Sequence, residues 1–196
     1  WAETLCIGSG MGTSEKSKKI LKTALENLSV PCLIDADGLN LIAEHRKYMD
    51  RIPHDHLIIT PHMKEMSRLT GISVLELKSR RMEILKEFTE KHHITCVLKD
   101  YSTVVASPGE RAYINRSGNA SMAKAGAGDV LDGIVAGLMA QGVDCQEAGI
   151  LGTYLHGRAG ELARRETGSS SETAGGLIEH LRIDFKETAE SKSAKS

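Results

Sequence analysis

Apolar residues alternate along the chain between short continuous runs and helically spaced positions. The continuous runs predict buried strands at 5–7, 32–34, 57–60, 94–98, 103–107 and 111–115. The last two runs flank a Pro-Gly-Glu turn at 108–110, a pattern typical of a β-hairpin.

Polar residues with capping chemistry stand before several helically spaced segments. Ser14 is the expected N-cap of the first helix, and Ser73 with Glu76 has the spacing of a capping box for one helix that continues through Phe88. Further helices are predicted from Asp129 onward, at 145–166 and at 174–183. Short strands alternating with helices predict an α/β fold, a three-layer α/β/α sandwich with a mostly parallel central sheet.

Composition and charge exclude several classes of protein. The 196 residues carry 25 Lys and Arg against 26 Asp and Glu, a net charge of −1 that argues against general binding of nucleic acid or anionic membranes. Aromatic residues make up 4%, too few for a base-stacking platform. No apolar stretch approaches the roughly 20 residues of a membrane span, so we expect a soluble, cytoplasmic protein. The four cysteines form no CxxC pair, and those in apolar runs are expected to be buried hydrophobic residues.

Four polar motifs each follow a predicted strand. They are GSGMG at 8–12, DADGLN at 35–40, TPHMKE at 60–65 and KDYST at 99–103, and we interpret DADGLN as an acidic turn. In open parallel sheets, ligands bind beyond the carboxyl ends of the strands. The four motifs are therefore expected to meet at one edge of the sheet.

The segment 117–142 carries the strongest chemical signal. Gly126, Ala127 and Gly128 are small enough for their amides to approach an anion, and they precede a helix whose N-terminus favours negative charge. Asp129 stands where it can orient a substrate hydroxyl and accept its proton. The alternative is an N-cap aspartate preceded by flexible glycines, and the Walker A pattern is absent.

The run GNASMAKAGAGDVLDGIVAGL at 118–138 resembles the NAD(P)H-hydrate dehydratase family, within the ribokinase-like superfamily. IGSGMGTS, PCLIDADGLNLIA, LIITPHMKEMSRLTG and VLKDYSTVV resemble other motifs of that family in the same order. The resemblance implies a ribokinase-like domain over residues 1–185, followed by a polar tail at 186–196. It also implies that an N-terminal part of the domain, which precedes Trp1, is missing from this chain.

The resemblance implies ADP- or ATP-dependent dehydration of hydrated NADH or NADPH (the S-epimer), through phosphoryl transfer to the ring hydroxyl and elimination. Mg²⁺ is the expected companion of the nucleotide. The implied catalytic residues are Asp129, Gly126, Ala127 and Gly128; the implied nucleotide-binding residues are Lys99, Asp100, Tyr101, Ser102, Thr103, Asn119, Met122 and Gly128; and the implied substrate-binding residues are Gly10, His62 and Asp129. No residue is assigned as a metal ligand.

Some residues depart from the family pattern or have a second interpretation. Asp100 replaces a family glycine and would repel phosphate unless its side chain points outward or meets the metal. His62 could instead cap a strand end. Glu65, Asp35 and Asp37 are interpreted as turn or cap carboxylates rather than as metal ligands.

Two other functions remain open at this point. One is a ribokinase-like kinase of a small alcohol of the thiamin-precursor type, and the other is a catalytically degenerate nucleotide-binding module. In every case the expected partners are small molecules, and the apolar helices within 129–166 predict a homo-oligomer.

Overall fold

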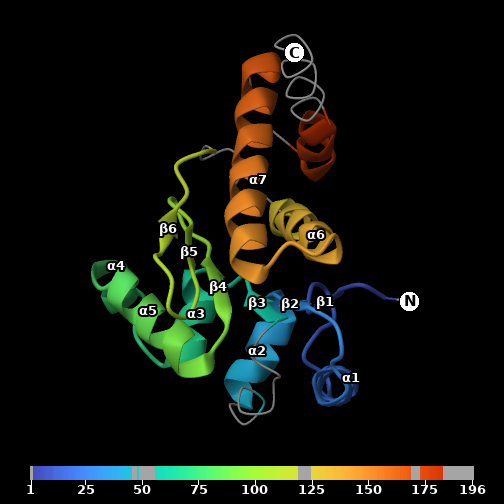
Figure 1. Cartoon of the computed structure of the whole chain (residues 1–196), viewed down its shortest axis with the longest axis vertical. Coiled ribbons are helices and arrows are strands. Elements are labelled where there is room, and N and C mark those ends of the chain that lie inside the picture. The colour runs from blue at the N-terminus through green and yellow to red at the C-terminus, as the bar shows by residue number, and fades with distance from the viewer. Residues whose placement is uncertain (1, 46–47, 49–55, 119–124, 169–172, 183–196) are drawn as a thin grey trace.

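The structure is a computed structural model that describes residues 2–45, 48, 56–118, 125–168 and 173–182. Its central sheet has six strands in sequence order (Figure 1), which are β1 (Leu5–Ile7), β2 (Cys32–Ile34), β3 (Leu57–Ile59), β4 (Thr95–Leu98), β5 (Val104–Ala106) and β6 (Tyr113–Ile114). The first four strands are parallel, and β5 and β6 continue the sheet as an antiparallel hairpin. The predicted mostly parallel sheet and the predicted hairpin are confirmed.

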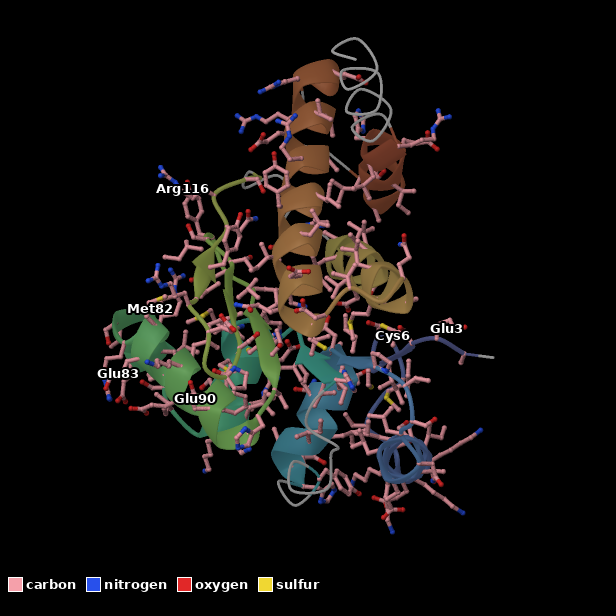
Figure 2. The ribbon with its side chains drawn as sticks, in the orientation of Figure 1. Glu3, Cys6, Met82, Glu83, Glu90 and Arg116 are labelled. Atoms are coloured by element: carbon pink, nitrogen blue, oxygen red, sulfur yellow. The ribbon has the colours of Figure 1, made fainter. Side chains whose placement is uncertain are left out.

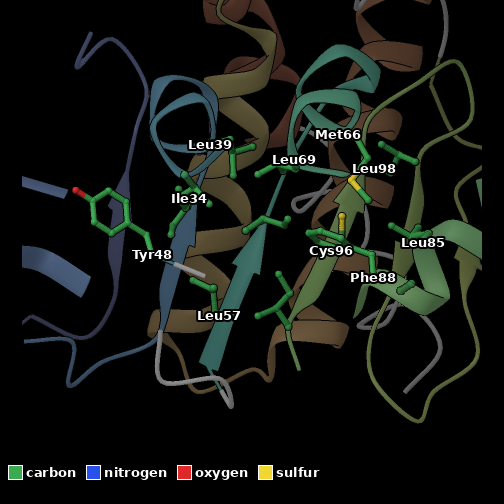
Figure 3. Close-up of a cluster of buried hydrophobic side chains, with 14 of the residues drawn as sticks. Ile34, Leu39, Tyr48, Leu57, Met66, Leu69, Leu85, Phe88, Cys96 and Leu98 are labelled. Atoms are coloured by element: carbon green, nitrogen blue, oxygen red, sulfur yellow. The ribbon is translucent and has the colours of Figure 1, made fainter. Parts of the chain in front are cut away.

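Helices cover both faces of this sheet. Their bounds are α1 (Glu15–Glu26), α2 (Ala36–Glu44), α3 (Met63–Thr70), α4 (Val74–Ser79), α5 (Arg81–His92), α6 (Ala127–Ala140) and α7 (Cys145–Thr167), with a further helical segment at 174–182. Successive strand side chains point to opposite faces. Ile34, Leu57 and Leu98 therefore pack against α1 to α5 (Figure 3), whereas Leu33 and Ile58 pack against α6 and α7.

The remaining apolar surface of α6 and α7 joins these two helices to the segment 174–182. Val130 of α6, Leu155 of α7 and Leu177 share one buried cluster. The first turn of α6 is therefore held both by the sheet and by the C-terminal helices. Among the described residues, no helix is both long and apolar enough to cross a membrane.

Two short helices stand where the sequence predicted none. The motif at 35–40 is not a turn, because residues from Ala36 onward form α2, and α3 begins directly after His62. Both helices pack their apolar side chains against the core, where Leu39 of α2 and Met66 of α3 are buried. Neither helix was predicted, because α2 has nine residues and α3 has eight, which is a short stretch in which to recognise a helical period.

Two predictions about helix boundaries also differ from the structure. The single helix expected after Ser73 is two, since α4 ends at Ser79 and α5 starts at Arg81. The Ser73 hydroxyl does accept from the Glu76 amide. Asp129 does not open α6, which begins at Ala127 with Gly126 as the N-cap. Asp129 is therefore the third residue of the helix.

The cysteines follow the burial of their strands. Cys32 and Cys96 are buried, as predicted, and Cys145 is partly buried. The prediction of burial is wrong for Cys6, which is exposed on β1, an edge strand of the described sheet (Figure 2). All four are free thiols.

Candidate functional site

The four polar motifs meet at the carboxyl edge of the parallel strands, as predicted. The Gly12 amide donates to Asp37 Oδ2 at 2.9 Å, which joins the first motif to the second. Lys99 Nζ lies 2.7 Å from Asp35 Oδ2, which joins the fourth motif to the second. His62 and Lys99 pair through their backbones as an extension of β3 and β4.

Gly8 allows the first motif to approach the second closely. Its φ is +130°, and a Cβ at this position would collide with the backbone carbonyl of Asp35. The turn that contains Gly10 therefore continues directly from a segment packed on the start of α2. Only a residue without a side chain permits this approach.

Asp35 and Lys99 form a largely buried ion pair. The Asp35 side chain is 6% exposed and the Lys99 side chain is 21% exposed. Asp35 occupies the N-cap of α2, yet its side chain makes no capping hydrogen bond. Its carboxylate is directed instead to the Lys99 ammonium group.

The first turn of α6 lies beside this ion pair. Gly126, with φ +84°, places the backbone in the left-handed region just before the helix. A Cβ at Gly128 would lie 3.7 Å from Lys99 Nζ and 3.9 Å from Asp35 Oδ2. The unpaired amides of a helix N-terminus and a lysine ammonium group therefore stand together, an arrangement suited to a phosphate group.

His156 of α7 supports the same turn from the other side. It forms a hydrogen bond with the backbone of Ala127, and burial lowers its pKa to about 4. The imidazole is therefore neutral near pH 7. Sequence analysis did not identify His156, because nothing local indicates that a residue in the middle of α7 reaches the start of α6.

His62 is the N-cap of α3. Its Nδ1 accepts from the Lys64 amide at 3.0 Å and from the Glu65 amide at 3.2 Å. Glu65 completes a capping box by accepting from the His62 amide at 2.8 Å. The interpretation of Glu65 as a cap carboxylate is confirmed, whereas His62 caps the start of helix α3 rather than the end of a strand. Burial, followed by the nearby Lys99 charge, lowers the pKa of His62.

The turn after β4 contains the acidic residue that departs from the family pattern. Asp100 Oδ2 lies 3.5 Å from Nη1 of Arg81, which also donates to the Ser102 carbonyl at 3.1 Å. Asp100 is thus turned toward a cation on α5. Tyr101 is 93% exposed, and the Thr103 carbonyl accepts from the Asn115 amide at 2.8 Å.

Asp132 is a site residue that the sequence analysis missed. It is 2% exposed, and its Oδ1 accepts from the Thr60 hydroxyl at 2.9 Å. Burial, followed by the charge of Asp35, raises the pKa of Asp132 from 3.8 to about 8. A signal was available, because Asp132 shares the buried side of α6 with Val135 and Met139.

Asp129 itself is exposed, and its side chain forms no hydrogen bond or ion pair with the described residues. Asn119 and Met122 lie outside the described residues. Within the described part of the chain, no group of three His, Cys, Asp or Glu residues could hold a metal ion. Asp35, Asp37 and Glu65 instead bind Lys99 or backbone amides, as described above.

Comparisons with known proteins show which family this chain belongs to. The sequence model of the NAD(P)H-hydrate dehydratase (Carb_kinase) family matches residues 1–182. A bifunctional NAD(P)H-hydrate repair enzyme Nnr from Moorella thermoacetica is 38% identical over 91% of this chain and 34% of its own length. An ADP-dependent (S)-NAD(P)H-hydrate dehydratase from Neisseria meningitidis is 38% identical over 88% of this chain and 59% of its own length.

Solved structures share the fold. The ADP/ATP-dependent NAD(P)H-hydrate dehydratase from Bacillus subtilis, co-crystallised with ATP and Mg²⁺, superposes with a TM-score of 0.80 at 30% identity. The superposition covers 94% of this chain and 64% of that one. A ribokinase-like superfamily protein from Enterococcus faecalis, 24% identical with a TM-score of 0.79, covers 95% of this chain and 63% of its own and supports the fold. The chain thus spans between a third and two thirds of these relatives.

The family match covers nearly the whole chain, and the family motifs meet at one edge of a ribokinase-like sheet. This chain belongs to the NAD(P)H-hydrate dehydratase family.

Proposed function

We propose that this chain carries out ADP- or ATP-dependent dehydration of hydrated NADH and NADPH, as the dehydratase region of a repair enzyme. The observation that carries the proposal is the position of the Lys99 ammonium group beside the first turn of α6 at Gly128. Asp129 follows as the next residue and is exposed at the same end of the helix. A transferring phosphoryl group and a hydroxyl nucleophile have complementary partners there.

In the proposed reaction, Asp129 accepts the proton of the ring hydroxyl, and the hydroxyl oxygen attacks the terminal phosphorus of the nucleotide. The bond from that phosphorus to the nucleotide's bridging oxygen breaks, and the shorter nucleotide leaves. The ring then carries a phosphate ester, which departs as phosphate while a neighbouring ring proton is lost. Phosphorylation precedes the elimination because hydroxide is a poor leaving group and phosphate is a good one.

The nucleotide is proposed to lie along Lys99, Asp100, Tyr101, Ser102 and Thr103, with Asn119 and Met122 nearby and its phosphates at Gly128. Mg²⁺ would arrive with those phosphates and neutralise charge during transfer. The Arg81 contact supports this placement, because it neutralises the one acidic side chain of the turn. The hydrated nicotinamide is proposed to contact Gly10, His62 and Asp129.

The test is recovery of reduced-nicotinamide absorbance from hydrated NADH in the presence of ADP or ATP with Mg²⁺. Asp129→Asn should lower turnover by about a hundredfold or more, the range for loss of a general base, while nucleotide binding remains. Glu147→Gln is a matched control, since Glu147 is also an exposed carboxylate at the third position of its helix, α7. Equal turnover in Asp129→Asn and the control would exclude the assigned role.

The same assay separates the alternatives. Consumption of nucleotide with a small alcohol, without recovery of reduced nicotinamide, would support the kinase. Binding of nucleotide without any turnover would support the degenerate module.

A cytoplasmic location and a homo-oligomer remain predictions. Exposed apolar side chains on the C-terminal helices support the second of these predictions: Leu151 is 40% exposed, Tyr154 is 43% exposed and Ile178 is 56% exposed.

A further inference from the structure

Two buried carboxyl groups lie beneath the first turn of α6. Asp35 is 4% exposed and Asp132 is 2% exposed. One oxygen of each has a partner, since Asp35 Oδ2 binds Lys99 and Asp132 Oδ1 accepts from Thr60. The other two oxygens, Asp35 Oδ1 and Asp132 Oδ2, are fully buried and accept no hydrogen bond from the described residues.

A single proton explains this pair of buried oxygens. Two ionised carboxylates at this depth would repel each other and leave both oxygens without a donor. The nearby charge of Asp35 adds to burial in raising the pKa of Asp132 to about 8, and a hydrogen bond between the two carboxyl groups requires that one of them carries a proton. With one proton between them, each oxygen has a hydrogen-bond partner and the pair carries one negative charge.

Other titratable and polar groups surround the pair. At the start of α3, Glu65 and His62 each interact with the charges of both Asp35 and Lys99. Lys99, after β4, and the Thr60 hydroxyl both favour the ionised form of Asp132. Partial burial, followed by the charges of Asp132, Asp35 and Asp129, raises the pKa of Cys6 on β1 to about 11, so this thiol stays neutral. On α7, His156 is also neutral near pH 7, as described above. The single negative charge of the pair is therefore balanced by Lys99.

We propose that Asp132 is a positioning residue, which in its neutral form donates a hydrogen bond to Asp35 and so holds the Asp35–Lys99 pair beside the amides of α6. The role rests on the proposed function, because it serves the binding of the transferring phosphoryl group. Asp132 does not touch the reacting atoms in this scheme.

The charge of Asp132 matters because the site must accept an anion. When Asp132 is neutral, Lys99 and Asp35 cancel and the α6 amides dominate the local field. When Asp132 is ionised, an extra negative charge lies one helical turn from Asp129 and competes with the phosphoryl group for Lys99. Turnover should therefore fall as the pH rises past the titration of Asp132.

The decisive variant is Asp132→Asn. The amide keeps the size of the neutral acid, can donate to Asp35 and can accept from Thr60, but it cannot ionise. Wild-type kcat should fall above about pH 8, whereas Asp132→Asn should keep a measurable kcat without this alkaline decline. Asp132→Leu removes the donor and should lower kcat by about tenfold or more across the pH range, the scale expected when a binding group is misplaced.

A pair of threonine variants tests the contact independently. Thr60→Val removes the donor that favours ionised Asp132 and should move the alkaline decline to higher pH. Thr95→Val is the matched control, because the buried Thr95 hydroxyl pairs with Ser107 at 2.8 Å, away from the carboxyl pair. A shift in Thr95→Val equal to that in Thr60→Val would contradict the proposal.

Stability measurements give a readout that does not depend on turnover. Between pH 3.8 and about 8, folded Asp132 holds a proton that the unfolded chain has released, so wild-type stability falls with rising pH in this range. Asp132→Asn lacks this loss, and its unfolding temperature should rise relative to wild type as the pH increases from 4 to 8. Glu147→Gln, which makes the same change in charge at an exposed position, should run parallel to wild type.

The outcomes are distinguishable. Parallel stability curves for wild type and Asp132→Asn would overturn the shared proton. An alkaline decline of kcat that persists in Asp132→Asn would overturn the positioning role. Absence of turnover in wild type with either nucleotide would overturn the proposed function and the positioning role with it, and the stability curves would still decide whether the proton is shared.

Discussion

Replacing Lys99 by Met removes the ammonium group that joins β4 to the start of α2 while keeping a side chain of similar length. Lys99 Nζ lies 2.7 Å from Asp35 Oδ2, and the exposed fractions of the two side chains are 21% and 6%. Asp35 would remain buried, next to Asp132, without the cation that pairs with it among the described residues. The perturbation therefore measures how strongly the site depends on this ion pair.

The expected magnitude follows from the burial. Breaking a fully buried ion pair costs about 3–5 kcal/mol, whereas exposed pairs contribute about 0–1 kcal/mol. Lys99 keeps some contact with solvent, so we expect a loss of about 2–3 kcal/mol in the free energy of unfolding. For a chain of this length, that corresponds to a decrease of roughly 4–12 °C in the unfolding temperature.

Urea unfolding at pH 7 measures the loss directly. The double variant Lys99→Met with Asp35→Asn should recover at least about 1 kcal/mol relative to Lys99→Met, because it no longer buries an unpaired charge. Lys18→Met is the control, because Lys18 Nζ lies at a similar distance, 2.8 Å, from Oε1 of Glu15, a side chain that is 89% exposed. This substitution should leave the free energy of unfolding nearly unchanged. A loss below about 0.5 kcal/mol in Lys99→Met, or no recovery in the double variant, would refute the reasoning.

Three further predictions concern neighbouring residues. Gly128→Ala should fold normally, because its Cβ would meet only ordinary contacts at 3.7 and 3.9 Å. Nucleotide affinity measured by calorimetry should fall by about tenfold, because the methyl group covers the amides. Unchanged affinity would place the phosphates elsewhere. Arg81→Ala should weaken nucleotide binding by up to about fivefold, more at low salt, because Asp100 loses its cation, and Asp100→Asn in that background should restore binding. The pKa of His62 is lowered from 6.5 in the folded chain, so wild-type stability should fall as the pH drops below about 6.5. His62→Asn keeps a capping side chain, and its unfolding temperature should fall less steeply between pH 7 and 5. An equal slope in wild type and variant would contradict this prediction.

The strands and the long helices could be predicted from the sequence because their signals are local. Val97 and Val105 lie in continuous apolar runs, and the buried positions of α6 recur at helical spacing. The short helices α2 and α3 were not predicted in this way, because they have only nine and eight residues. Packing against the sheet stabilises these two helices, and this packing is not visible in a local sequence pattern of so few residues.

Part of the site was also predictable. Parallel strands bring their carboxyl ends to one edge, so the motifs that contain Gly10, His62 and Lys99 were expected to meet there. The partners within that edge were not predictable. Lys99 and Asp35 are 64 positions apart, and Thr60 and Asp132 are 72 positions apart.

By itself, the sequence determined the family motifs and the order of the strands and longer helices, and it predicted an anion-binding helix start at 126–128. Only the tertiary structure decided which carboxyl groups are buried. Asp37 and Asp132 look alike in the sequence, yet one accepts from an exposed amide and the other is buried beside Asp35. The physical reason is that burial and partners set the protonation of an acid, and both are supplied by residues that lie far away along the chain.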